Sequence, residues 1–221
     1  MAWSREAPGK RPESEGEIET EHGLSILVVG EGHGFGDIPA FEYARNLVAA
    51  QPDWRVIGSR LGGAPHGVSQ ETLPGIAGLP NLRLLDNVDA TRLVEGAITG
   101  RETYDRIVFH NPHIEEGDAL TRARATGGLI DGFVRSARAL LTPGGFARVT
   151  INPQFVRQFT AVSGAIARAG GRLVGRFGDD PELYAPFTPL RTQGGLIRLP
   201  GDEPAGIGLA AYNFHRGSAL T

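Results

Sequence analysis

Cysteine is absent from this 221-residue chain, and three other features are missing with it. Without a thiol there is no disulfide, no thiolate metal site and no cysteine nucleophile. No apolar run approaches the roughly 18 residues of a membrane-spanning helix, and the N-terminus lacks a basic-then-apolar signal pattern. Basic residues are not in excess either, because the formal net charge is −3 and the pI about 6.1. We therefore expect a soluble, cytoplasmic protein without a membrane partner, and we predict no metal site.

The acidic balance disfavours a large nucleic-acid partner, because a positive field is what holds a phosphate backbone. Basic residues do recur at Arg122, Arg124, Arg135 and Arg138, a pattern that is more often a solvated helix face. RNA therefore stays open as a partner, but a small-molecule or nucleoside-like substrate is favoured.

Residues 1–22 are polar, with glutamates at positions 13, 15, 17, 19 and 21. Such a segment cannot bury enough apolar surface to offset its ordering entropy, so we predict a flexible acidic tail. The remaining residues, 23–221, are enough for one domain with a full-sized core.

Strand and helix patterns alternate along that domain. Strands are expected at Leu24–Val29, Trp54–Gly58, Leu82–Leu85, Tyr104–Phe109 and Phe146–Ile151, and within residues 172–178 and 207–215. Helices are expected over Ile38–Val48, Leu93–Ile98, Leu129–Leu141 (stopped by Pro143-Gly144-Gly145) and Phe155–Ile166. The order predicts an α/β fold with a doubly wound, Rossmann-like, mostly parallel sheet and an antiparallel C-terminal edge. Residues 207–215 would then form an exposed edge strand that could pair two subunits, although the oligomeric state stays unknown.

A glycine-dense turn follows the first strand directly, reading Gly30-Glu31-Gly32-His33-Gly34. Glycines let the backbone turn tightly beside a ligand, and the free N–H groups of the next helix face it. The turn begins like G-x-G-x-x-G but has Phe35 where the last glycine would stand. It predicts a nucleotide-type cofactor at the carboxyl ends of the strands.

Polar residues follow the next strands at the same edge of the sheet. Ser59 and Arg60 follow the second strand, where a dehydrogenase would usually have a carboxylate, and Arg60 could instead suit the 2′-phosphate of NADP. Asp89, before Ala90, could accept a hydrogen bond from an adenine amine or cap a helix. His110-Asn111-Pro112-His113 follows the fourth strand, and the proline favours an extended exit for Asn111.

Together these segments resemble the Rossmann-like methyltransferase family of the rRNA uridine-N3 methyltransferases. The resemblance covers about residues 24–215 and rests on V-V-G-E-G, V-D-A-T, Y-D-R-I-V-F with P-H, and L-L-x-P-G-G. A later loop, Tyr184–Thr192, is also similar to that family. The resemblance implies a class I methyltransferase fold with S-adenosylmethionine as cofactor and S-adenosylhomocysteine as product. It implies that the methionine portion lies near Gly30, Glu31 and Gly32, the adenosine near Ser59, Asp89 and Ala90, and the target base near Pro112 and His113. His33, Arg60 and Asn111 are further candidates for cofactor binding.

The chain departs from the family pattern at two of these places. Gly62 stands where the family has the ribose carboxylate, so Glu31 or a backbone group is expected to replace it. His110-Asn111 replaces the two residues before the proline, which indicates altered substrate contacts.

Methyl transfer to a ring nitrogen needs alignment of the nucleophile and an acceptor for its proton. His113 is the first candidate base and His110 the second, because imidazole titrates near neutral pH, and Asn111 would orient the substrate through its amide. We therefore expect an S-adenosylmethionine-dependent transferase that N-methylates a small nitrogen heterocycle or nucleoside-like substrate, with rRNA uridine-N3 methylation as the alternative. An NADP-dependent reductase and a non-catalytic nucleotide-binding protein are the hypotheses from other classes.

Overall fold

The computed structural model describes residues 23–31, 41–61, 78–95, 102–112, 114, 116–176, 191–192, 195–196 and 209–217. The N-terminal tail prediction, and the calls on Gly32, His33, Gly62 and His113, lie outside these residues. The elements are β1 (Ser25–Val29), α1 (Glu42–Ala50), β2 (Arg55–Ser59), β3 (Leu82–Leu85), the 3-10 helix η2 (Ala90–Arg92), β4 (Tyr104–His110), α2 (Ala119–Arg138), β5 (Leu141–Ile151), α3 (Pro153–Gln158), α4 (Thr160–Arg168), β6 (Arg172–Arg176), β7 (Arg191–Thr192), β8 (Gly195–Leu196) and β9 (Ala210–His215).

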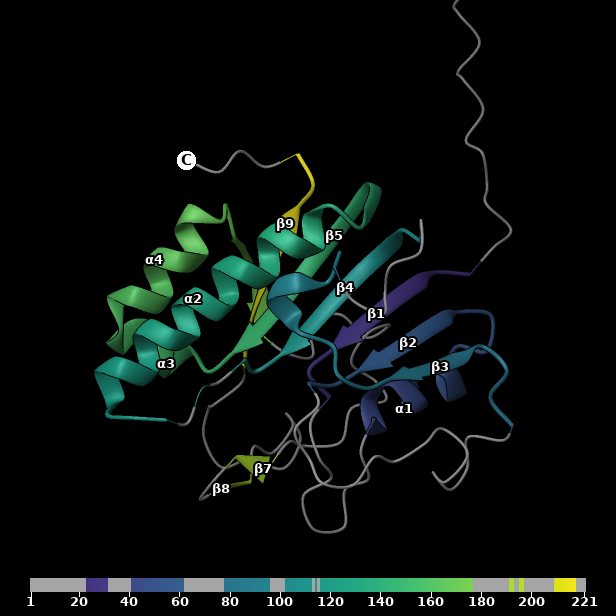
Figure 1. Ribbon diagram of the computed structural model, residues 1–221, viewed down its shortest axis with the longest axis horizontal. Helices are drawn as coiled ribbons and strands as arrows, with labels where there is room; N and C mark the ends of the chain where they lie inside the picture. Colours follow the sequence, from purple (N-terminus) through teal and green to yellow (C-terminus); the bar gives the residue numbers. More distant parts are fainter. Residues whose placement is uncertain are drawn as a thin grey trace, which may run out of the picture.

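A seven-stranded sheet in the order β3-β2-β1-β4-β5-β9-β6 organises these elements (Figure 1). The pairs among β1 to β5 are parallel, whereas β9 is antiparallel to both β5 and β6. This confirms the doubly wound sheet with antiparallel strands at its C-terminal side. The prediction that residues 207–215 form an exposed edge strand is wrong, because β9 lies between β5 and β6.

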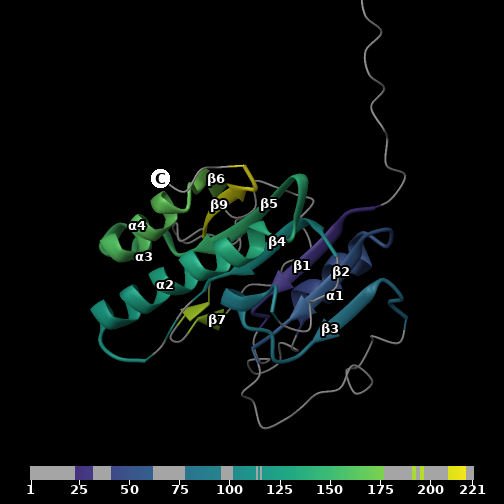
Figure 2. The same cartoon turned by 45° about the horizontal axis from the view of Figure 1, so that its top comes forward.

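Two apolar clusters lie on opposite faces of the sheet, because side chains alternate along each strand. Leu27, Val29, Ile107 and Phe109 belong to the cluster that includes α2 and α4 residues. Ile26 and Val28 belong to the cluster that includes α1 residues. Figure 2 shows the same arrangement, with the sheet between α1 and the α2–α4 layer. No helix within the described ranges is long and apolar enough to cross a bilayer.

Helix α2 starts ten residues before the predicted Leu129, at Ala119, after Asp118 caps its first turn through the Thr121 amide at 2.8 Å. The N-terminal half of α2, which the sequence did not predict, packs through small residues. Large apolar residues therefore do not recur there at helical spacing. A Cβ on Gly127, for example, would lie 2.7 Å from the Ala161 carbonyl oxygen in α4.

Two further boundaries differ from the prediction. Pro143-Gly144-Gly145 lies inside β5 rather than at a helix end, where the pairing with β4 shifts register and Gly144 has a φ of 85°. The single helix expected over Phe155–Ile166 is divided into α3 and α4 by Phe159, whose backbone is extended.

Candidate active site

The carboxyl ends of β1, β2 and β4 bring most of the predicted site residues to one edge of the sheet. The Glu31 amide after β1 donates to the Ser59 carbonyl at the end of β2, at 2.9 Å. The Arg60 amide in turn donates to the Leu85 carbonyl of β3, at 3.1 Å. On the other side, β4 pairs with β1 up to Phe109, directly before His110. The predicted residues therefore share one rim, as the parallel topology requires.

Gly30 makes the turn after β1 in a conformation that other residues rarely adopt, with a φ of 71°. A Cβ at this position would also lie 2.5 Å from Cε2 of Phe109 on the neighbouring strand. The Phe109 ring is itself fixed edge-on against Phe133 of α2, with 5.1 Å between ring centroids. The first glycine of the turn is thus required both by the backbone and by close packing against β4.

Glu31 turns its carboxylate away from the strand ends and toward α1. Its Oε1 accepts a hydrogen bond from the Ala44 amide, at 2.8 Å, in the first turn of the helix. Phe41, the residue before α1, makes no side-chain capping bond, so Glu31 caps the helix from a distant segment. A Cβ on Gly58 would lie 2.7 Å from Glu31 Oε2, so the glycine in β2 makes room for this carboxylate. Glu31 therefore ties the turn to both β2 and α1.

Ser59 and Arg60 are buried rather than presented to solvent. The Ser59 hydroxyl donates to the Val28 carbonyl at 3.0 Å, which ties β2 to β1. The Arg60 guanidinium pairs with Asp86 after β3 and lies 5.1 Å from the ring centroid of Phe41. An NADP 2′-phosphate would have to bind the Arg60 guanidinium, which is already engaged by these contacts.

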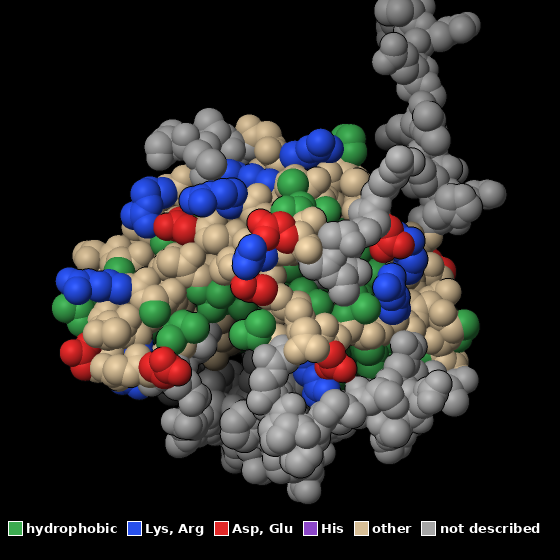
Figure 3. All heavy atoms as spheres, in the orientation of Figure 1, with side chains coloured by type: hydrophobic (Ala, Val, Ile, Leu, Met, Phe, Trp, Pro, Cys, Tyr) green, Lys and Arg blue, Asp and Glu red, His purple; other side chains and the backbone are tan. Residues whose placement is uncertain are grey.

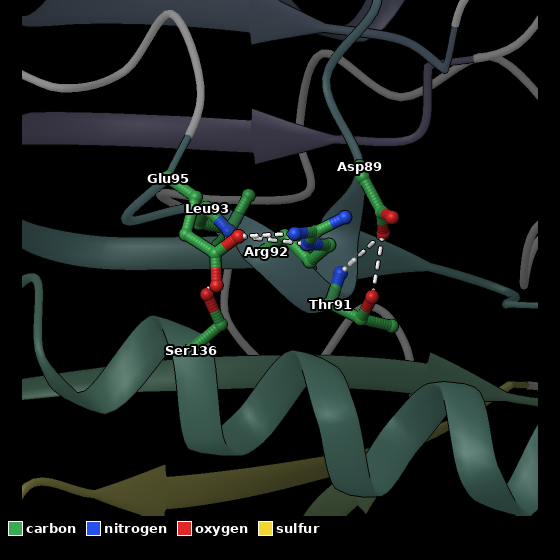
Figure 4. Close-up of polar contacts among 6 residues, drawn as sticks. All are labelled: Asp89, Thr91, Arg92, Leu93, Glu95 and Ser136. Carbon is green, nitrogen blue, oxygen red and sulfur yellow. Dashed lines mark hydrogen bonds and ion pairs between the residues drawn. The ribbon is translucent and has the colours of Figure 1, made fainter.

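Asp89 caps the short helix η2 (Figure 4). Its Oδ1 accepts from the Thr91 amide at 2.8 Å and from the Thr91 hydroxyl at 2.7 Å. Ser136 of α2 holds the end of the same helix by accepting from the Leu93 amide at 2.6 Å. The capping alternative for Asp89 is confirmed. Because Asp89 is exposed, its capping bonds are compatible with a second contact to a ligand.

His110 and Asn111, at the end of β4, are both held by Thr150 of β5. Nδ1 of His110 lies 2.9 Å from Oγ1 of Thr150, and the Asn111 amide donates to the Thr150 carbonyl at 2.7 Å. Asn111 is left-handed, with a φ of 43°, a region that asparagine tolerates better than most residues. The fully buried Thr150 thus fixes the turn that leads into Pro112.

The His110 ring is kept neutral by its surroundings. Burial, followed by the positive charge of Arg148, lowers its pKa from 6.5 to about 3. The ring also packs edge-on against Tyr43 of α1, with 4.4 Å between centroids. A half-buried imidazole that stays neutral is better suited to positioning the turn than to accepting a proton near pH 7.

Three residues of this rim were not anticipated from the sequence: Thr150, Asp86 and Ser136. Each acts on a segment far away in the chain, through a hydrogen bond or an ion pair. Only Thr150 had an available signal, because a parallel β4–β5 pair places it beside His110.

Comparison with solved structures gave several methyltransferases, all with TM-scores below 0.5. TrmN from Thermus thermophilus is 24% identical with a TM-score of 0.47, and the match covers 70% of this chain and 39% of TrmN. The T. thermophilus 16S rRNA N2 methyltransferase RsmC, in complex with AdoMet and guanosine, is 18% identical with a TM-score of 0.46, covering 88% of this chain and 38% of RsmC. The chain thus spans well under half the length of either protein. A comparison with curated proteins gave no match.

A mostly parallel sheet with a glycine turn after β1, and with the antiparallel strand β9 between β5 and β6, is a Rossmann-like fold. A model of the BMT5-like family, described as rRNA (uridine-N3-)-methyltransferase BTM5-like, matches residues 70–186, more than half of the chain. The chain therefore belongs to this methyltransferase family. The reductase and non-catalytic hypotheses are not supported.

Proposed function

We propose that this protein transfers a methyl group from S-adenosylmethionine to the imide nitrogen of a uracil-type ring. The observation that carries the proposal is the family match over residues 70–186, which includes η2, β4 and the His110-Asn111 turn. A uridine in rRNA contains this imide, and among the small heterocycles and nucleoside-like substrates considered from the sequence the proposal selects those with a uracil-type ring. The acidic net charge of −3 supports the first, and the family description supports the second.

The residues at the strand ends fit S-adenosylmethionine, which supplies a methyl group made electrophilic by a sulfonium. Gly30 bends the chain at the rim without a side chain, which supports it as a residue whose backbone would approach the methionine portion. The exposure of the Asp89 carboxylate supports it as the acceptor for an adenine amine, since its capping bonds to Thr91 leave it reachable from solvent. Because Glu31 is engaged by α1, its contribution is to hold the turn, and a backbone group is the better candidate for the ribose.

On the acceptor side, Asn111 is the candidate to bind the imide edge. A uracil ring presents carbonyl acceptors on either side of an N–H donor, and an amide side chain can both donate and accept. The nitrogen must lose its proton as it attacks the methyl carbon, and His113 remains the proposed base. His110, held neutral against Thr150, would position this turn.

Incubation with radiolabelled S-adenosylmethionine and two matched acceptors tests the reaction. Uridine should take up label, whereas N3-methyluridine, which lacks the imide proton, should not. Mass spectrometry of the digested product should place the methyl group on the ring nitrogen. Label on carbon or oxygen, or equal label in both acceptors, would refute the proposal.

A second arm compares uridine with a uracil-containing RNA. Methylation of the free nucleoside at a rate similar to RNA would favour the small-molecule substrate, and methylation of RNA alone would favour the rRNA-type substrate. Calorimetry separates cofactor binding from chemistry: S-adenosylhomocysteine should give heat, and NADPH should not.

A further inference from the structure

The net charge of −3 conceals a strong segregation of charge along the chain. Residues 119–176 contain nine arginines, no lysine and one acidic residue, Asp131. This segment forms α2 to α4 together with β5 and β6, so its net charge of +8 belongs to one part of the fold. The negative charges lie elsewhere in the sequence.

Several of these arginines share one face of α2. Arg124 and Arg135 are both exposed and lie eleven residues apart, close to three turns of 3.6 residues. Arg138 follows three residues later, on nearly the same line. The opposite face packs into the core through Ile130, Phe133 and other buried residues. A row of positive side chains therefore runs along the solvent side of α2.

Arginines at the C-terminal end of α4 and the start of β6 lie beside this row. Nη2 of Arg138 donates to the Ala169 carbonyl at 2.6 Å, which joins the last turns of α2 and α4. Arg168 lies next to that carbonyl and contacts Asp131 at 2.7 Å, and the exposed Arg172 begins β6. We call Arg124, Arg135, Arg138, Arg168 and Arg172 the arginine track. Figure 3 shows basic side chains gathered over the α2–α4 layer.

Helix electrostatics accounts for only part of the track. Arg135 and Arg138 lie in the last turn of α2, where the helix dipole favours cations. Arg124 lies in the second turn, where the dipole gives a cation no favourable interaction. Hydrogen bonds from Thr121 are the main cause of the lowered pKa of the capping Asp118, and the charge of Arg124 also contributes, but this needs no exposed row of arginines. Arg124 also extends the track toward the end of α2 that follows β4 in the chain.

From this arrangement we infer that the arginine track binds the phosphate backbone of an RNA whose uracil enters the site. The inference rests on the proposed function, because it names the carrier of the acceptor base. Arginine suits this task, since its guanidinium stays charged and can grip a phosphate with two N–H groups. Helix α2, with 20 residues, is about 30 Å long, so a bound strand would follow it for several nucleotides.

Binding of a uracil-containing oligoribonucleotide at several salt concentrations tests the track. The double variant R124E/R135E should raise the Kd at least about tenfold and lower the slope of log Kd against log salt by about one per arginine. The matched control R55E/R83E reverses two exposed arginines on β2 and β3 and should behave like the wild type. R124K/R135K keeps both charges and should retain binding to within a few-fold.

Equal loss of binding in R124E/R135E and in the control, or no loss in either, would overturn the inference. So would preference for anionic lipid vesicles over RNA. Because binding is measured without methyl transfer, the two proposals fail separately. If uridine is methylated but RNA binding is unchanged in R124E/R135E, the proposed function holds and the inference about the arginine track is wrong. If no uracil acceptor is methylated, the proposed function fails while the binding result still decides the RNA surface.

Discussion

Mild acidification should destabilise this protein through His110, a half-buried histidine at the end of β4. Burial and Arg148 lower the pKa of His110 from 6.5 to about 3. Between these two values the unfolded chain binds a proton at this residue and the folded chain does not. The unfolded state therefore takes up more protons, and the free energy of unfolding falls as the pH falls. Above the ordinary pKa both states are neutral, so the residue then contributes no pH dependence.

The size of the effect follows from the distance below that ordinary pKa. At about pH 5 the unfolded histidine is some 1.5 pH units below 6.5, and each unit corresponds to about 1.4 kcal/mol. The loss relative to neutral pH is thus about 2 kcal/mol. This is a large share of the 5–15 kcal/mol typical of a folded domain.

Urea denaturation of the wild type and of His110→Gln at about pH 7, 6 and 5 measures this loss. Glutamine does not titrate, and other groups cancel when the two curves are subtracted. The difference in unfolding free energy should therefore shrink by about 2 kcal/mol from pH 7 to pH 5. Thr150→Val is the control: it removes the hydroxyl partner of Nδ1 but keeps the burial, so its pH dependence should persist. A flat difference curve would show that the ring is protonated in the folded state and would refute the reasoning.

Substitutions at three positions, Gly58, Glu31 and Thr150, test how the rim is held. Gly58→Ala places a Cβ 2.7 Å from Glu31 Oε2, so we expect about 1–3 kcal/mol lower stability and weaker binding of S-adenosylhomocysteine by calorimetry; an unchanged Kd would contradict this. Glu31→Gln keeps an acceptor for the Ala44 amide but removes the charge at the α1 N-terminus, which should cost about 0.3–1 kcal/mol in urea denaturation, whereas Glu31→Ala should cost about 1–2 kcal/mol. Thr150→Val should lower kcat while leaving the Kd of S-adenosylhomocysteine unchanged, and Thr150→Ser should restore kcat; a parallel change in both constants would indicate a general loss of structure instead.

The position of the site could be predicted because parallel strands leave little choice. Once β1 to β4 are recognised, their carboxyl ends must share an edge, and the residues that follow them must meet there. The bounds of β3, Leu82–Leu85, were predicted as observed, since a short apolar run between turns is a clear strand signal. The start of α2 was missed for the opposite reason. Its first half packs through small residues such as Gly127, which leave no apolar period to detect.

Side-chain directions at the rim could not be predicted in the same way. Glu31 points to Ala44 and Arg60 to Asp86, and each partner lies on a different element. A motif gives the residue type at a position but not the neighbour that the fold supplies. Glu31 matched a cofactor-binding pattern, for example, while its carboxylate caps a helix. A motif alone therefore does not distinguish residues that contact the ligand from residues that position other groups. The proposed variants can make this distinction.

Which partner a charged protein binds depends on the local electrostatic field at its surface and not on the net charge of the whole chain. At physiological ionic strength charges more than about 8 Å apart in solvent are largely screened, whereas α2 alone is about 30 Å long. A phosphate beside Arg124 therefore responds mainly to that arginine, and a second phosphate farther along the strand to Arg135, whereas carboxylates on distant segments hardly affect either. The net charge of −3, which favoured a small substrate, is an average over regions that a polyanion would never contact together. Because the slope of log Kd against log salt counts the phosphates that a protein neutralises, the change of slope in R124E/R135E tests the track more directly than the strength of RNA binding does.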